Sequence, residues 1–163
     1  MVNTYVVCFG EMQQRVKAES SQIAVRGFDD EGGSLFESLV FDEAYEVLFR
    51  EYFYGAEGEI TRFLSAYLKN MPAVSSLVDT SEAGSEDFIA QLVMPSGFNN
   101  AFAKAVGINI EGFFKAYILY RWFVDKLPER AEVFQATYMD LGSRICADLN
   151  KRSCGVERGN RYW

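Results

Sequence analysis

Residues 94–149 read MPSGFNNAFAKAVGINIEGFFKAYILYRWFVDKLPERAEVFQATYMDLGSRICADL. Apolar side chains recur along this stretch every three or four residues, which predicts a helix over residues 97–126 that is apolar around most of its circumference. Pro128 interrupts the pattern and is typical of the first turn of a new helix. A second amphipathic helix is therefore expected from Pro128 to about Leu149, and the short link predicts that the two helices lie antiparallel. We expect this pair to form the centre of the fold.

The rest of the chain predicts one more long helix and a small sheet. Apolar residues at helical spacing predict a helix over residues 42–70, with Asp42 in a position typical of an N-cap. Runs of β-branched and aromatic residues near 4–9 and 87–94 predict two short strands, which are expected to pair. The predicted fold class is therefore mainly α: a helical bundle of three long helices with a small β element.

The remaining segments are less regular. Residues 11–26 fit either a helix with a thin apolar stripe or a hairpin that uses QIAVR as a second strand. Glycine and acidic residues predict a loop over 27–34, and small polar residues predict another over 73–85. We expect residues 1–150 to form a single α-rich domain, followed by a basic, aromatic C-terminal tail at residues 151–163.

The composition excludes several classes of protein. The net charge is −7 and the pI is about 4.7, which disfavours wrapping of nucleic acid or docking on an anionic membrane, because both need a surplus of Lys and Arg. The chain has no His, which excludes Ser-His-Asp and Cys-His mechanisms and zinc sites that use His. The N-terminus lacks the pattern of a signal peptide, and the apolar runs are too short to span a bilayer.

The three cysteines predict reduced thiols. Cys8, Cys146 and Cys154 are far apart and lack CxxC spacing, which disfavours a disulfide framework or a zinc knuckle. We therefore expect the protein to reside in a reducing compartment of the cytosolic type, where thiols stay reduced. Cys146 lies beside the apolar stripe of the last helix and is expected to behave as a small buried apolar residue.

No stretch predicts a catalytic, cofactor-binding or metal site. The acidic loop around residues 29–31 lacks the alternating ligand positions of a calcium loop. Gly107 and Gly112 lie inside a helical pattern, so they predict close helix–helix contact rather than a phosphate-binding loop. An enzyme working with carboxylates or lysine would need two acids at a defined spacing, which the sequence does not show. We therefore expect a protein that is not an enzyme.

Candidate interface residues lie at two places. The first is Arg121 and Trp122, near the end of the central helix, because Arg and Trp are the residue types that most often anchor interfaces. The alternative interpretation places Trp122 in the core, with Arg121 paired or reaching outward. It is the favoured one, since aromatic residues at helical spacing usually belong to the core.

The second place is the tail. Its four cations and one acid give a net charge of +3, so residues 1–149 carry −10 of the total of −7. The contrast predicts that the tail docks on the acidic surface of a neighbouring identical subunit; a frayed terminus is the alternative. The predicted interface residues of the tail are Arg152, Arg158, Arg161, Tyr162 and Trp163.

The order of these elements resembles that of small proteins encoded in phages and prophages of Bacteroides-like bacteria. The resemblance covers most of residues 35–152 in pattern, and it departs in the tail, where Gly155 and Gly159 interrupt the usual basic run. The motifs that carry it are Phe41-Asp42-Glu43, Leu92-Val93-Met94-Pro95, Phe98-Asn99, Arg121-Trp122-Phe123 and Glu129-Arg130-Ala131-Glu132.

Such proteins look like virion components near the head–tail junction, where helical connectors and adaptors form rings. The resemblance implies a homo-oligomeric ring that contacts neighbouring phage structural proteins such as portal or tail components. It implies no cofactor, and localisation in the virion after assembly in the host cytoplasm. The acidic composition argues against a membrane or a specific nucleic acid as partner. The alternative hypothesis is a helical interaction or regulatory module that binds a host or phage protein through an exposed apolar groove.

Overall fold

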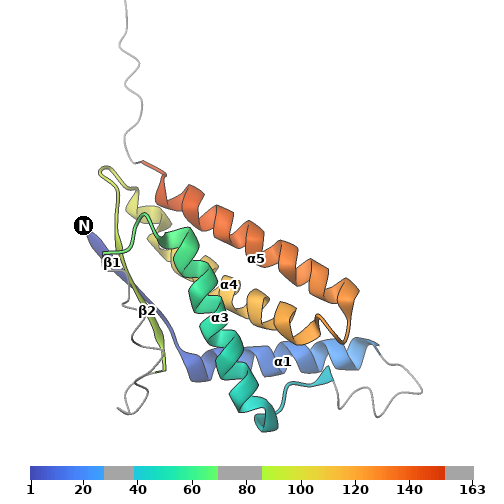
Figure 1. Ribbon diagram of the computed structural model, residues 1–163. Helices are drawn as coiled ribbons and strands as arrows, with labels where there is room; N and C mark the ends of the chain where they lie inside the picture. Colours follow the sequence, from blue (N-terminus) through green and yellow to red (C-terminus); the bar gives the residue numbers. More distant parts are fainter. Residues whose placement is uncertain (28–38, 70–85, 153–163) are drawn as a thin grey trace, which may run out of the picture.

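A computed structural model describes residues 1–27, 39–69 and 86–152 of the chain. It confirms a mainly helical fold with one small antiparallel sheet (Figure 1). In chain order the elements are β1 (Val2–Val7), α1 (Phe9–Gly27), the 3-10 turn η1 (Glu43–Tyr45), α3 (Glu46–Leu64), β2 (Phe88–Val93), the 3-10 turn η3 (Asn100–Phe102), α4 (Ala103–Phe123) and α5 (Pro128–Leu149).

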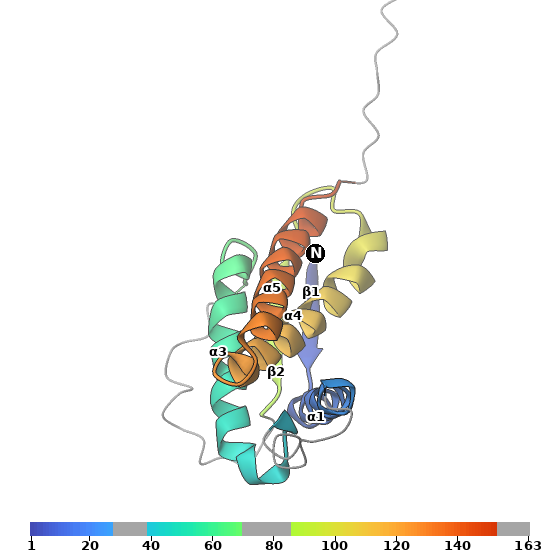
Figure 2. The ribbon, with the colours of Figure 1, turned by 90° about the vertical axis from the view of Figure 1, so that its right-hand side faces the viewer.

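Helix α4 is the central element, as its apolar circumference predicts. Helix α5 begins at Pro128 and runs back along α4, so the predicted antiparallel pair is confirmed (Figure 1). Helices α3 and α1 pack against other sides of α4, and the sheet lies behind it (Figure 2). With α1, the bundle has one long helix more than the three predicted.

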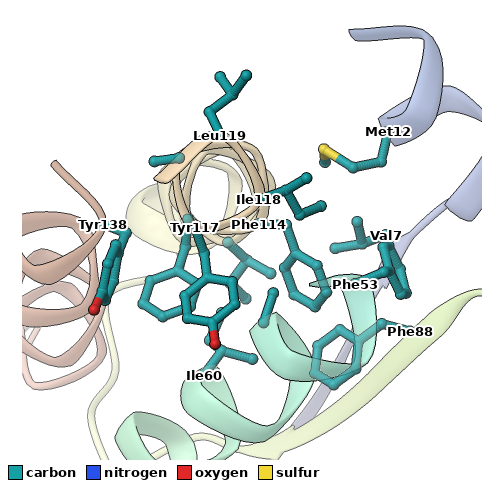
Figure 3. Close-up of a cluster of buried hydrophobic side chains, with 14 of the residues drawn as sticks. Val7, Met12, Phe53, Ile60, Phe88, Phe114, Tyr117, Ile118, Leu119 and Tyr138 are labelled. Atoms are coloured by element: carbon teal, nitrogen blue, oxygen red, sulfur yellow. The ribbon is translucent and has the colours of Figure 1, made fainter. Parts of the chain in front are cut away.

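Residues from every layer meet around α4 (Figure 3). Phe53 and Ile60 of α3 approach it from one side and Tyr138 of α5 from another, with Phe88 of β2 close to Phe53. Aromatic rings make up much of this core and meet mostly edge to face, as between Phe113 and Tyr138, whose centroids are 5.5 Å apart. Such pairs stabilise a core beyond the area they bury.

The two strands pair antiparallel, as predicted, with register from Val2↔Val93 to Val7↔Phe88. Their side chains alternate between the two faces of the sheet. On the inner face Val7, Phe88 and Leu92 are buried against the helices, whereas the other face is exposed.

Residues 11–26 belong to helix α1, so of the two interpretations the helix is correct. A buried serine ties this helix to the chain that leads into α3. The Ser20 hydroxyl is fully buried; it donates to the Lys17 carbonyl at 3.0 Å and accepts the Phe41 N–H at 3.0 Å. Except for Gly27, the loops predicted at 27–34 and 73–85 lie outside the described residues.

Helix α3 starts later than predicted. The Tyr45 N–H donates to the Asp42 carbonyl at 3.0 Å, which closes a 3-10 turn before the α-helix begins at Glu46. Tyr45 rather than Asp42 therefore occupies the N-cap position.

Helix α3 also ends earlier than the predicted boundary near residue 70. After Leu64 the chain turns toward the sheet, where the Lys69 N–H donates to the Gln91 carbonyl at 2.9 Å and the Val93 N–H donates to the Tyr67 carbonyl at 2.6 Å. These bonds to β2 compete with continuation of the helix. The spacing of apolar residues within the helix does not predict them, because their partners lie far away in the sequence.

Helix α4 starts at Ala103, six positions after the predicted start at residue 97. Gly97 has φ 78°, a left-handed conformation that a helix cannot contain and that glycine adopts without strain. Asn99 then caps the 3-10 turn, since its side-chain oxygen accepts the Ala101 N–H at 3.1 Å. The predicted close approach of helices is confirmed at Gly112, where an added Cβ would lie 3.3 Å from Leu141 of α5; Gly107 instead faces Tyr5 of β1.

Candidate interaction surfaces

Trp122 is a core residue, not an exposed anchor. Its side chain is 3% exposed, and its indole N–H donates to the Leu39 carbonyl at 2.8 Å. The ring also meets Phe41, with centroids 4.7 Å apart. A group buried in this way is not available to a partner, so the core interpretation replaces Trp122 as an interface residue.

Arg121 lies on the surface and keeps its place among the candidates. Its guanidinium carbon lies 5.4 Å from the centre of the Tyr52 ring, which is a cation–π distance. Burial raises the pKa of Tyr52 and the positive charge of Arg121 opposes that rise, so the phenol stays neutral at ordinary pH. Arg121 and Tyr52 thus form a surface pair that joins α4 to α3.

Lys126 completes an aromatic cluster that sequence reasoning missed. Its ammonium nitrogen lies 2.9 Å from the centre of the Trp122 ring and 5.6 Å from that of Tyr45. Burial lowers the pKa of Lys126 to about 8, whereas the ring faces favour its charged form. The spacing of Trp122 and Lys126, four residues apart at the end of a helix, was a usable signal for this contact.

The start of the tail is attached to the body. The Asn99 N–H donates to the Lys151 carbonyl at 2.9 Å, and Arg152 forms an antiparallel bridge with Phe98. The Lys151 ammonium lies 4.2 Å from the centre of the Phe102 ring and 2.7 Å from a carboxylate oxygen of Asp148. Lys151 and Arg152 are therefore held beside the start of α4.

The two predicted interface residues on the described surface, Arg121 and Arg152, lie far apart. Arg121 lies at the C-terminal end of α4 and Arg152 follows the C-terminal end of the antiparallel α5, so the two residues are at opposite ends of the helical pair (Figure 1). The other four predicted tail residues lie outside the described residues: Arg158, Arg161, Tyr162 and Trp163.

Both described thiols are held in their protonated forms. Burial raises the pKa of the Cys146 thiol, whose sulfur lies 3.4 Å from the Phe63 carbonyl. Desolvation, followed by the negative charges of Asp87, Glu11 and Glu111, raises the pKa of Cys8. Both thiols therefore resist forming the thiolate that nucleophilic or metal-binding cysteines need.

A surface hollow of about 350 Å³ lies between α1 and α4. Two ion pairs cross it: Arg15 to Glu111 at 2.6 Å and Lys115 to Glu19 at 3.3 Å. Its charged side chains already satisfy one another, so the hollow resembles a polar seam between helices more than a binding pocket.

Within residues 1–27, 39–69 and 86–152, no cluster of three or more His, Cys, Asp or Glu side chains is placed to hold a metal ion. The helices of these same segments include none whose length and apolar character suit a membrane span. Comparison with protein-family models, with curated proteins and with solved structures found no match to this chain.

Proposed function

We propose that this protein is a non-enzymatic structural component of a phage virion, a head–tail connector or adaptor that assembles with copies of itself into a ring. The helical body would act as the rigid unit, and the tail would contact the next copy. Portal or tail proteins would be its other partners in the particle.

The observation that carries this proposal is the fixed start of the tail. The bonds of Lys151 and Arg152 to residues 98–99 hold the chain at one end of the body. Eleven residues follow, 153–163, so an extended tail has a reach of roughly 35 Å, enough to contact a neighbouring subunit. A fixed exit point gives every subunit the same geometry, which a closed ring requires.

Charge supports the same arrangement. The tail at residues 151–163 carries +3, and the rest of the chain carries −10. Opposite charges of this size favour association of one copy's tail with another copy's body at low salt, and salt screens the attraction. We therefore expect assembly to weaken as ionic strength rises.

Purified particles test the viral assignment. We expect mass spectrometry of particles from the phage or induced prophage that encodes the chain to detect its peptides in a fixed ratio to the portal protein. Electron microscopy of the isolated protein, or of particles, is expected to show rings. Particles without this protein would defeat the assignment.

A truncated chain tests the role of the tail. A variant lacking residues 153–163 keeps the attachment at Lys151 and Arg152 and is expected to lose ring assembly. The matched control replaces Arg158 and Arg161 by lysine, which preserves charge and should preserve most of the salt-dependent attraction. Rings of unchanged size in the truncated protein would contradict the proposed role.

The alternative, a helical interaction module, requires an exposed apolar groove. The hollow between α1 and α4 contains one strongly exposed apolar side chain, Ile108, at 59% exposure. Charged and polar residues make up most of its wall. The described surface therefore supports this alternative less well.

A further inference from the structure

Strand β1 has an unpaired margin. Among the described residues the sheet has the order β1-β2, so β1 is bonded to one strand only. The Met94 N–H donates to the Met1 carbonyl at 3.0 Å, and in an antiparallel ladder the bonded pairs alternate. The N–H and C=O groups of Val2, Thr4 and Val6 therefore point away from β2, and no described residue forms a hydrogen bond with them.

The opposite margin of the sheet is occupied along Gln91 to Val93. The Tyr67 carbonyl and the Lys69 N–H bond to Val93 and Gln91 of β2, and Leu68 forms a bridge with Leu92. Additional strand pairing along the full length of the sheet is therefore possible at β1.

Nothing in β1 protects this margin from pairing. Natural proteins usually place Lys, Pro or a bulge on an exposed edge strand to prevent association. The strand VNTYVV contains no charged residue and no proline, and its six residues pair with β2 without a bulge.

The exposed face of the sheet is mostly apolar, with Thr4 and Gln91 as its two polar residues. Val2 and Val6 of β1 are 44% and 46% exposed, and their partners Val93 and Ile89 of β2 are 44% and 56% exposed. Thr4 lies between the two valines on the same face. β-Branched side chains of this kind favour pairing across strands.

We propose that a second copy of this chain pairs with β1 along this margin, antiparallel and centred on Thr4. The order Val2, Thr4, Val6 is the same in both directions, so a two-fold axis beside Thr4 matches Val2 of one copy with Val6 of the other. In this register the outward N–H and C=O groups of Val2, Thr4 and Val6 in each copy all form hydrogen bonds with the other copy. A shift by two residues leaves one valine of each strand unpaired, which makes the centred register the preferred one.

The contact is small and isologous. Two short strands bury less than the roughly 1,000 Å² expected of a stable interface, so the dimer should depend on concentration. A two-fold contact also differs from the tail-mediated contact proposed above, which is head-to-tail. This inference does not rest on the proposed function, because it uses β1 and no residue of the tail.

A proline at the centre of the margin tests the pairing. Thr4→Pro removes an N–H that points away from β2, so the ladder between β1 and β2 is kept. We expect light scattering and sedimentation of the full chain over a concentration series to show a wild-type dimer, and the variant's dissociation constant to rise by about tenfold or more. Thr4→Val retains the N–H and is the matched control, expected to dimerise as the wild type does.

Thr4→Lys is an independent test, because it should weaken the dimer while retaining the backbone N–H that proline removes. It places two ammonium groups together at the two-fold axis and should also weaken the dimer, while circular dichroism shows an unchanged helical fold. A monomeric wild type at all concentrations, or variants that dimerise as tightly as the wild type, would overturn the proposal.

A disulfide tests the register. In the centred dimer the two Thr4 Cα atoms are about 5.5 Å apart, within the range of a disulfide. Thr4→Cys should therefore form a covalent dimer on mild oxidation, and Gln91→Cys, on the same face but one strand further from the axis, should not. Equal crosslinking of both variants would contradict the register. Repeating the Thr4 tests in the chain lacking residues 153–163 separates this dimer from assembly through the tail.

Discussion

At the scale of single residues, Trp122 fixes the position of a segment far away in the chain. Its indole N–H is the donor for the buried Leu39 carbonyl, and its ring packs on Phe41. A buried carbonyl without a donor is costly, because water cannot replace the lost bond. One side chain of α4 therefore holds the segment that leads into α3.

We predict that Trp122→Phe lowers the free energy of unfolding by about 1–3 kcal/mol, since the Leu39 carbonyl loses its donor. Urea denaturation measures the change. Tyr120→Phe on the same helix is the control, because the Tyr120 hydroxyl forms no hydrogen bond with another described residue and its loss should have little effect. Equal stability of the Trp122 variant and the wild type would show that this bond contributes nothing.

Lys126 makes stability depend on pH. Its pKa is lowered from 10.5 to about 8 in the folded protein, so above pH 8 the folded state releases this proton before the unfolded state does. Because the unfolded state then binds more protons, this residue's contribution to the free energy of unfolding rises between about pH 8 and 10.5 and is constant outside that window.

We predict that the stability of the wild type, minus that of Lys126→Met, rises from pH 7.5 to pH 9.5. The subtraction removes the contributions of thiols and tyrosines, which are the same in both proteins. Denaturation at a series of pH values measures it, and NMR titration of the Lys126 side chain gives the pKa directly. A pKa at or above 10.5 would show that the attraction of the aromatic rings exceeds the effect of burial.

At the scale of elements, glycine marks the places where helices approach one another. A Cβ at Gly142 of α5 would lie 2.8 Å from the Phe63 ring of α3, which is packed edge to face against Phe113. A Cβ at Gly58 of α3 would meet nothing within 4 Å. Substituting alanine at these two positions therefore distinguishes the effect of packing on stability from the effect of helix propensity.

We predict that Gly142→Ala destabilises the protein by about 1–3 kcal/mol, because the ring must shift in a packed core. Gly58→Ala is expected to stabilise it by up to about 1 kcal/mol through helix propensity alone. Thermal and urea denaturation of the two variants, compared with the wild type, test both signs. A stabilising Gly142→Ala would mean that α3 and α5 can separate without cost.

Sequence periodicity predicted the elements whose determinants are local. The start of α5 at Pro128 and the two strands β1 and β2 themselves depend on features that can be read in a few neighbouring residues. The end of α3 could not be read in this way, because Tyr67 and Lys69 leave the helical path to bond with a strand more than twenty positions later. The left-handed Gly97 likewise delayed the start of α4 against an uninterrupted apolar pattern.

The candidate surfaces were predicted only in part. Sequence favoured a buried Trp122, which is confirmed, but residue type alone had also placed it among interface anchors. The contact of Lys126 with Trp122 was missed because the apolar pattern does not identify a lysine whose ammonium group lies over a buried ring. The free margin of β1 was missed because an edge strand is defined by its neighbours in space, which the sequence does not show.

At the scale of the whole molecule, the body and the tail are expected to be energetically independent. The last described contacts end at Arg152. We predict that removing residues 153–163 changes the free energy of unfolding of the body by less than about 0.5 kcal/mol, as for surface changes away from packed contacts. Urea denaturation at low protein concentration measures it. A larger loss would show that the tail folds onto its own body.

The pairing of β1 with β2 also has a consequence for synthesis. Val2 is made early and its partner Val93 is made about ninety residues later. At roughly 5–20 residues per second, β1 leaves the ribosome on the order of ten seconds before β2 exists. An uncharged, β-branched strand is thus without its intramolecular partner for that time. Neighbouring nascent chains on one messenger would present the same strand side by side, so translation rate and ribosome spacing are expected to influence how cleanly this protein folds.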